Sequence, residues 1–287
     1  AMEYKSPNSI DEAVALLAGA GGKARILAGG TDLLVQIRMG FASPELIIDI
    51  KNIPELRAIT SSKGGIRVGA AVSGAELGEH ADVSKAWPGV VEATELIGST
   101  QIQGRASLGG NLCNASPAAD TVPALVAAGA VCRVVGTGGE RNVPVEEINT
   151  GPGSTSLGDD EFVVDFDFPV RPARSGDAYL RFIPRTEMDI AVVGAGVSLT
   201  LAEDGSCQDA RVSLGAVAPT VVLLEEGAKA LIGTTIDEGA LKELDSAARA
   251  ACNPINDKRG TIEFRTDVAG VLARRAALIA KERAEVN

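Results

Sequence analysis

The chain has 287 residues, 45% of them hydrophobic and only 3% aromatic, so it is long enough for two domains with aliphatic cores. Its formal net charge of −11 disfavours nucleic-acid binding, which relies on clustered lysine and arginine. We find no signal peptide and no apolar run long enough to span a membrane, and we expect a cytoplasmic protein.

Cysteine and histidine, the usual ligands of zinc and iron–sulfur clusters, are sparse. The four cysteines have no C-x-x-C spacing, which disfavours such a site in this chain and predicts buried free thiols instead. The single histidine, His80, lies in a polar stretch and is expected at the surface. We therefore expect no metal site and no imidazole or thiolate catalysis. The cysteines are Cys113, Cys132, Cys207 and Cys252.

The first expected elements form a small α/β lobe that ends near residue 52. A capping box at Ser9 and Glu12 predicts a helix that ends in the glycine-rich stretch 19–22. A strand at 24–28 then leads directly into Gly29-Gly30. Thr31 and Asp32 can cap the following helix, and residues 46–50 are expected to form another strand.

A larger lobe is expected to follow, from about residue 53 to 175. It contains a second capping box at 73–76 and a long, irregular loop between two helices. The segment 163–168 alternates apolar and acidic residues, as in a strand with one exposed face. The other expected elements are strands at 65–71 and 130–135 and helices at 89–97 and 121–128.

The remaining residues, 176–287, predict a separate C-terminal domain. Its pattern indicates a three-stranded antiparallel sheet backed by a helical bundle, which makes the whole chain α+β. We expect the apolar face of the last helix to be core, with Phe264, Val268, Val271, Leu272 and Ile279. The strands are expected at 179–183, 190–201 and 211–217, and the helices at 223–231, 238–251 and 261–283.

Two glycine-rich segments, 26–33 and 105–120, are the strongest functional signals. Glycine lets a backbone approach a pyrophosphate closely, Ser and Asn supply donors, and Asp can accept from sugar hydroxyls. The first segment also joins a strand to a helix N-terminus, which favours an anion. No G-x-G-x-x-G follows a strand and no Walker A motif occurs. The sequence therefore predicts a nucleotide site outside the Rossmann and P-loop folds.

The sequences of these segments, AGGTDL and SLGGNLCNASPAAD, resemble the FAD-binding subunit of the molybdenum hydroxylases, which include xanthine dehydrogenase, aldehyde oxidase and carbon monoxide dehydrogenase. Residues 185–191, RTEMDIA, and 256–265, NDKRGTIEFR, are similar to two further segments of that family. The resemblance implies a two-lobed PCMH-type FAD-binding domain at 1–175, followed by the flavoprotein subunit's C-terminal domain at 176–287.

The resemblance also implies which residues contact FAD. The first glycine segment would hold the pyrophosphate through its N–H groups, the second would hold its other side, and Ile97 would lie against the isoalloxazine. Asp120 would accept from sugar or ribityl hydroxyls, although it can equally cap the helix at 121. The implied contacts are Ile26, Leu27, Ala28, Gly29, Gly30, Thr31, Asp32, Leu33, Ile97, Ser107, Gly109, Gly110, Asn111 and Asp120.

The implied function is electron transfer without a catalytic side chain in this chain. A large partner would hold the molybdopterin, a small partner two [2Fe–2S] clusters, and the complex would be a dimer of heterotrimers. FAD would pass electrons to an external acceptor.

The sequence departs from the family at Gln103, where the family commonly has Arg. The alternatives are a stand-alone oxidase of the vanillyl-alcohol-oxidase type and a scaffold without FAD. Purine, N-heteroaromatic, aldehyde and carbon monoxide substrates all stay open.

Overall fold

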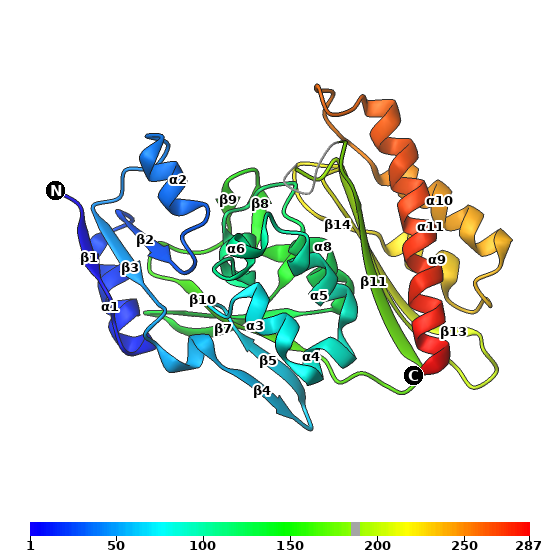
Figure 1. The fold of residues 1–287 in the computed structure, drawn as a ribbon, viewed down its shortest axis with the longest axis horizontal. Coiled ribbons are helices and arrows are strands. Elements are labelled where there is room, and N and C mark those ends of the chain that lie inside the picture. The colour runs from blue at the N-terminus through cyan, green and yellow to red at the C-terminus, as the bar shows by residue number, and fades with distance from the viewer. Residues whose placement is uncertain (185–189) are drawn as a thin grey trace.

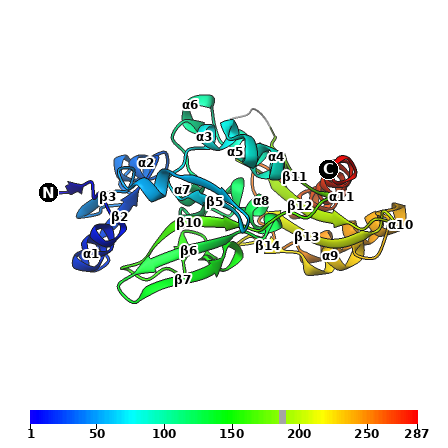
Figure 2. The same ribbon diagram turned by 90° about the horizontal axis from the view of Figure 1, so that it is seen from below.

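The computed structural model describes residues 1–184 and 190–287 (Figure 1). Three parts lie side by side, each built around its own sheet: a three-stranded sheet near the N-terminus, a five-stranded sheet in the middle and a four-stranded sheet near the C-terminus. Figure 2 shows the same order of parts from a second direction. A two-stranded ribbon, β8 with β9, completes the set. The chain is thus a mixed α/β protein.

The N-terminal sheet is parallel, with the strand order β1-β3-β2. As predicted, the Ser9 side chain accepts a hydrogen bond from the Glu12 N–H and starts the first helix. The core beneath this sheet includes Phe162 and Val164 of the middle sheet, so the two parts share apolar packing. The elements are β1 (Glu3–Lys5), α1 (Ile10–Ala20), β2 (Ala24–Leu27), α2 (Leu33–Arg38), β3 (Leu46–Asp49) and η1 (Pro54–Arg57).

The middle sheet is antiparallel, in the order β4-β5-β10-β6-β7, and helices cover one of its faces (Figure 2). Its strands are β4 (Ile59–Ser62), β5 (Gly65–Gly69), β6 (Val131–Gly136), β7 (Gly139–Pro144) and β10 (Phe162–Phe168), and the ribbon is β8 (Asn149–Gly151) with β9 (Ser154–Thr155). The helices are α3 (Gly74–Glu79), α4 (Ala81–Ala86), α5 (Pro88–Glu95), α6 (Thr100–Gln103), α7 (Leu108–Cys113), α8 (Thr121–Ala128) and η2 (Val145–Glu147).

The predicted exposed face of β10, the central strand of the sheet, is exposed only in part, since the side chain of Asp167 is 41% exposed. Asp165 is only 1% exposed, and its carboxylate lies 2.6 Å from the guanidinium of Arg133 on β6. Asp167 pairs with Arg67 of β5 at 2.9 Å. Arginines of the two neighbouring strands therefore neutralise both acidic residues, and such pairing is how the buried carboxylate of Asp165 is tolerated.

The C-terminal sheet is antiparallel, with the order β11-β12-β13-β14. The prediction of three strands was wrong by one, since β14 adds a fourth. Its two residues pair with Ser213 and Leu214 and are too few to show a periodic pattern in the sequence. The elements are β11 (Ser175–Phe182), β12 (Val193–Leu201), β13 (Cys207–Gly215), β14 (Val222–Leu223), α9 (Glu225–Leu231), α10 (Glu238–Ala251) and α11 (Ile262–Val286).

The predicted core face of α11 is confirmed only in part: Leu272 belongs to the core, and Val268 and Ile279 pack against it. Phe264 is 41% exposed, and most of the residues that face the sheet are alanines. Small side chains let the helix lie close to β11: a Cβ at Gly176 would stand 2.3 Å from the Ala280 carbonyl oxygen. Close contact over a long helix therefore replaces bulky side chains here. The buried alanines are Ala269, Ala273, Ala276, Ala277, Ala280 and Ala284.

Helix α8 joins the middle part to the C-terminal sheet. All eight of its residues are buried, and it packs on β12 and β13. Gly196 and Gly215 make room for Pro123, because a Cβ at either position would come within 2.7 Å of that proline. The Gly-Ala-Gly sequence in β12 thus serves helix–sheet packing.

A buried charge cluster holds the same two parts together. Asp177 of β11 accepts from the Gly89 N–H at 3.1 Å and lies 3.4 Å from the Arg171 guanidinium. Arg283 of α11 donates to the Asp177 carbonyl at 2.8 Å and to Glu92 at 2.7 Å. Burial raises the pKa of Asp177 to about 6, although Arg171 opposes this.

This shift gives a pH-dependent stability. Between about pH 6 and about pH 4 the folded protein holds the Asp177 proton more tightly than the unfolded chain, so this group makes the free energy of unfolding rise as pH falls. We expect Asp177→Asn to remove that rise, on the order of 2 kcal/mol. Urea unfolding of both proteins from pH 4 to 7 measures it. A difference between the two that does not vary with pH would contradict the assignment.

Candidate functional site

A cavity of about 690 Å³ lies between the N-terminal sheet and the middle part of the molecule. Its size falls in the range of cofactor sites. Both glycine segments line it, although about 70 residues separate them in the sequence. The residues of the predicted site that line this cavity are Ile26, Ala28, Gly29, Gly30, Thr31, Asp32, Leu33, Ser107, Gly109 and Gly110.

The first glycine segment presents unpaired backbone donors. Within the described part of the chain, the N–H groups of residues 29–33 donate to no protein acceptor. These residues follow β2, at the carboxyl edge of the parallel sheet, where ligands of such sheets commonly bind. Unpaired N–H groups are costly unless water or a ligand accepts from them. Five successive donors on a cavity are suited to a polyanion such as a pyrophosphate.

The glycines divide into two kinds. A Cβ at Gly29 would stand 2.0 Å from the Arg105 carbonyl oxygen, and one at Gly109 would stand 2.7 Å from the Ala70 carbonyl oxygen. Gly30 has φ +75°, which also favours glycine. These three are needed by the protein itself. Gly110 is different, because a Cβ there would meet only Ser107 Oγ, at 3.2 Å, and would otherwise point into open space.

The second glycine segment differs from the predicted irregular loop, because residues 108–113 form the short helix α7. The Ser107 side chain accepts from the Gly110 N–H at 3.1 Å and so caps this helix. Capping and packing thus explain two residues of this segment: Ser107 is a good N-cap, and Gly109 lets the turn approach Ala70.

Four residues of the predicted site lie outside the cavity lining. Leu27 is buried in the protein, and Ile97 is half-buried just beyond α5. The Asn111 amide oxygen accepts from the Thr121 N–H and hydroxyl. Asp120 accepts from Tyr179 and Arg181, each at 2.9 Å, and the pKa of its carboxyl is raised by burial despite Arg181.

The alternative role for Asp120, a cap on the helix at 121, is contradicted. Asp120 has helical backbone angles and its side chain makes no capping hydrogen bond with α8. Its carboxylate instead joins the middle part to β11 of the C-terminal sheet. The sequence could not show this, because Arg181 is remote in the chain.

Comparison with known protein families distinguishes a molybdenum-hydroxylase subunit from the alternative functions. Residues 1–171 match the family model of the FAD binding domain in molybdopterin dehydrogenase, and residues 178–280 match that of the CO dehydrogenase flavoprotein C-terminal domain. The chain belongs to the family of FAD-binding medium subunits of molybdenum hydroxylases.

Individual relatives agree along the whole length of this flavoprotein subunit. The chain is 33% identical to the carbon monoxide dehydrogenase medium chain of Hydrogenophaga pseudoflava, covering 96% of this chain and 95% of that one. It is 29% identical to the xanthine dehydrogenase FAD-binding subunit of Escherichia coli O157:H7, covering 95% and 93%. The solved carbon monoxide dehydrogenase structure from H. pseudoflava that lacks the Mo-pyranopterin moiety superposes with a TM-score of 0.94, 34% identity and 98% coverage of both chains.

The sequence did not reveal the other walls of the cavity in the flavoprotein subunit. One wall comes from the β8–β9 ribbon and the stretch up to β10, and another from the end of α2. Gln36 of α2 donates to the Asn114 side chain at 2.8 Å and so links the two parts across the cavity. Turns such as Gly151-Pro152-Gly153 were visible in the sequence, but nothing placed them near the glycine segments. These walls include Phe41, Ala42, Gly153, Thr155, Leu157, Gly158, Asp159 and Glu161.

Neither side chain that could bear a covalent flavin is suited to do so. Cys113 lines the cavity, but burial raises the pKa of its thiol to about 12, so it is not a thiolate nucleophile. His80 ends α3 and its ring accepts from the Val83 N–H, so it caps α4. Asp32 is the acidic residue of the first glycine segment, and desolvation raises the pKa of its carboxyl. All four cysteines are free.

The other family-like segments have structural roles where they are described. Residues 185–189 lie outside the described residues. Thr261 caps α11, and Arg265 is 4% exposed and donates to the Val192 carbonyl at 2.9 Å and to Asp257 at 2.8 Å. Gln103, which replaces the family's usual Arg, donates to the Glu95 carbonyl at the end of α5.

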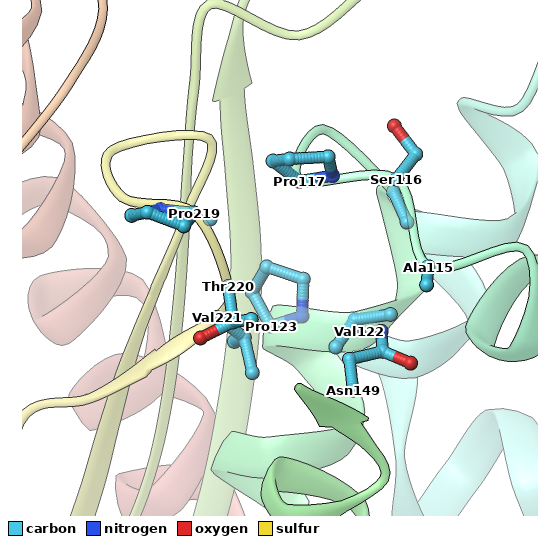
Figure 3. Close-up of a pocket in the computed structure, with 11 residues that line it drawn as sticks. Ala115, Ser116, Pro117, Val122, Pro123, Asn149, Pro219, Thr220 and Val221 are labelled. Carbon is cyan, nitrogen blue, oxygen red and sulfur yellow. The ribbon is translucent and has the colours of Figure 1, made fainter. Parts of the chain in front are cut away.

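A second, much smaller pocket lies where the loop 115–117 and the start of α8 meet residues 219–221 (Figure 3). Pro117, Pro123 and Pro219 surround it. Its volume of about 10 Å³ has room for about one water molecule. Asn149 Oδ1, which is buried there without a protein partner, could accept from such a water. This pocket is too small for a flavin.

In the described ranges there is no helix able to cross a membrane and no cluster of three potential metal ligands.

Proposed function

We propose that this flavoprotein subunit binds one FAD in the 690 Å³ cavity, with the pyrophosphate between the two glycine segments. The five unpaired N–H groups of residues 29–33 carry this proposal. Gly110 supports it independently, because its missing Cβ leaves space that the protein itself does not use. In this arrangement Ser107 and Gly109 shape the second wall, and Asp32 lies at the start of α2, where its side chain makes no capping hydrogen bond.

We also propose the finer organisation implied by the family. Residues 1–52 and 53–175 would be the two lobes of a PCMH-type FAD-binding domain, and 176–287 the C-terminal domain. The cavity between the first two sheets supports this division. Leu27 would contribute only backbone, Ile97 would face the isoalloxazine, and Asn111 and Asp120 would order the second segment and the sugar or ribityl hydroxyls.

In this function, bound FAD supplies the capacity to accept and release electrons, and the chain's residues bind it, orient it and exclude water. The partners we propose are a large molybdenum-cofactor subunit and a small subunit with two [2Fe–2S] clusters, assembled as a cytoplasmic dimer of heterotrimers. The names of the relatives support partner subunits, since one is a carbon monoxide dehydrogenase medium chain and another a xanthine dehydrogenase FAD-binding subunit. The electrons would pass to an external acceptor.

The purified chain is expected to bind one non-covalent FAD. The backbone donors are suited to a pyrophosphate, and the Cys113 thiol is protonated, so denaturation should release the flavin into the supernatant. Flavin fluorescence titration gives the stoichiometry, and chromatography of the supernatant identifies the nucleotide. Recovery of FMN, or no uptake at micromolar FAD, would contradict the proposal.

The same preparation distinguishes a subunit from a stand-alone oxidase. We expect no bleaching of the flavin absorbance when the lone FAD-loaded chain meets a purine, an aldehyde or a phenol, because substrate oxidation would occur in a partner. Bleaching should appear after co-expression with both partners. Direct reduction in the lone chain would instead support the vanillyl-alcohol-oxidase type.

A further inference from the structure

A chain of polar contacts runs beneath the first glycine segment, outside the cavity. The Tyr4 hydroxyl donates to Asp49, and the Lys51 ammonium donates both to Asp49 Oδ1 and to the Ala28 carbonyl oxygen, each at 2.9 Å. These residues come from β1, from the end of β3 and from the end of β2. They meet because all three strands are parallel and end at one edge of the sheet.

This cluster is built around a buried carboxylate. Asp49 is 6% exposed, and it also accepts from the Lys51 N–H at 3.0 Å. Although burial favours the neutral acid, the hydrogen bonds from Tyr4 and Lys51 lower the pKa of Asp49. Asp49 is therefore ionised, and its charge holds the Lys51 ammonium in place.

The contact with Ala28 fixes one peptide plane. In a trans peptide the Ala28 carbonyl and the Gly29 N–H are coplanar and point in opposite directions. A lysine that holds the carbonyl on one side therefore holds the N–H on the other. This constraint matters here because the next two residues are glycines, whose backbone has the widest choice of conformations. Without the anchor, that peptide could rotate and turn its donor away from the cavity.

We propose that Lys51, held by Asp49 and Tyr4, is a positioning residue that aims the N–H groups of the first glycine segment at the pyrophosphate of the cofactor. This proposal rests on the proposed FAD site. It makes Tyr4, on the exposed edge strand β1, part of the cofactor site although it does not line the cavity.

The test compares Lys51→Met with Lys51→Arg and with a matched control, Lys23→Met. Lys23 is on the same small lobe and also forms an ion pair, with Glu45 at 3.4 Å, but it does not line the cavity. Dissociation constants for FAD and for ADP are measured by fluorescence titration and by competition. ADP shares the pyrophosphate but has no flavin, so it reports on the glycine segment alone.

We expect Lys51→Met to weaken FAD and ADP by the same factor, roughly tenfold, the equivalent of one hydrogen bond to a charged group. Lys51→Arg should restore most of the affinity, because a guanidinium can donate to both the carboxylate and the carbonyl. Lys23→Met should bind as the parent does. Tyr4→Phe, which leaves Lys51 intact, should weaken both ligands about twofold to fivefold.

Three results would overturn the positioning role: unchanged affinity in Lys51→Met, an equal loss in Lys23→Met, or no rescue by Lys51→Arg. The melting temperature of Lys51→Met shows whether this variant is folded. If it is unfolded, the affinities of Tyr4→Phe and Lys51→Arg test the positioning role instead. If the parent protein takes up no FAD, the proposed site itself fails. If the parent binds FAD and the Lys51 variants bind equally well, only the positioning role fails.

Discussion

Replacing Gly110 with valine is expected to weaken FAD binding roughly a hundredfold, the equivalent of two charge-assisted hydrogen bonds, while the protein stays folded. Gly110 is exposed on the cavity wall, and a Cβ there meets only Ser107 Oγ. The added side chain would therefore occupy the space we assign to the pyrophosphate and keep it from the N–H groups opposite. Fluorescence titration measures the loss of affinity.

A matched control is available in α3. Gly78 lies in a six-residue helix that also starts at a capping serine, and a Cβ there has only ordinary contacts, the nearest at 3.5 Å. Gly78→Val should change FAD affinity by less than about twofold, because α3 does not line the cavity. Melting temperatures of both apo variants separate a folding defect from a lost site. Equal affinity in Gly110→Val and the parent would move the pyrophosphate elsewhere.

Replacing Arg265 with methionine is expected to lower the free energy of unfolding by about 3 kcal/mol. Arg265 is almost fully buried, and its loss would leave the Val192 carbonyl without its donor and Asp257 without its cation. The hydrogen bond from Arg265 also lowers the pKa of Asp257, so the partner is charged in the folded protein. Methionine keeps the length of the side chain, so the change tests polar pairing rather than packing.

Urea unfolding of the whole chain, followed by circular dichroism, measures this loss. Arg275, on the same helix but exposed, gives the control Arg275→Met, which should change stability by less than about 0.5 kcal/mol. FAD affinity should stay nearly constant in both variants, because neither residue lines the cavity. A strong loss of FAD affinity in a folded Arg265→Met would instead assign the family-like segment around Arg265 to the cofactor.

Local signals in the sequence were reliable where a few neighbouring residues decide the structure. The capping serines Ser9 and Ser73 start helices as predicted, and α8 and α10 have the predicted limits. Here the hydrogen bond that starts a helix joins residues only three apart, so the sequence contains both partners. The two glycine segments were found for the same reason, since each is a continuous stretch with a distinctive composition.

Features that depend on distant partners were predicted wrongly or not at all. The acidic residues of β10 indicated a solvent face, but only Asp167 is partly exposed, and Asp165 is buried against Arg133 of the next strand. The ion pair of Asp120 was not predicted either, because its partner Arg181 comes from another sheet. No local pattern shows which arginine will be adjacent, because strand order decides it.

Residue type and short spacing were enough to predict the family, the helix starts and the two glycine segments. The three-dimensional arrangement was needed to show that the segments share one cavity, and that Gly29 and Gly109 serve the protein's own packing while Gly110 faces the cavity. It alone also brought Tyr4, Asp49 and Lys51 together behind Ala28. The physical reason is that parallel strands bring their carboxyl ends to one edge whatever their separation in the chain.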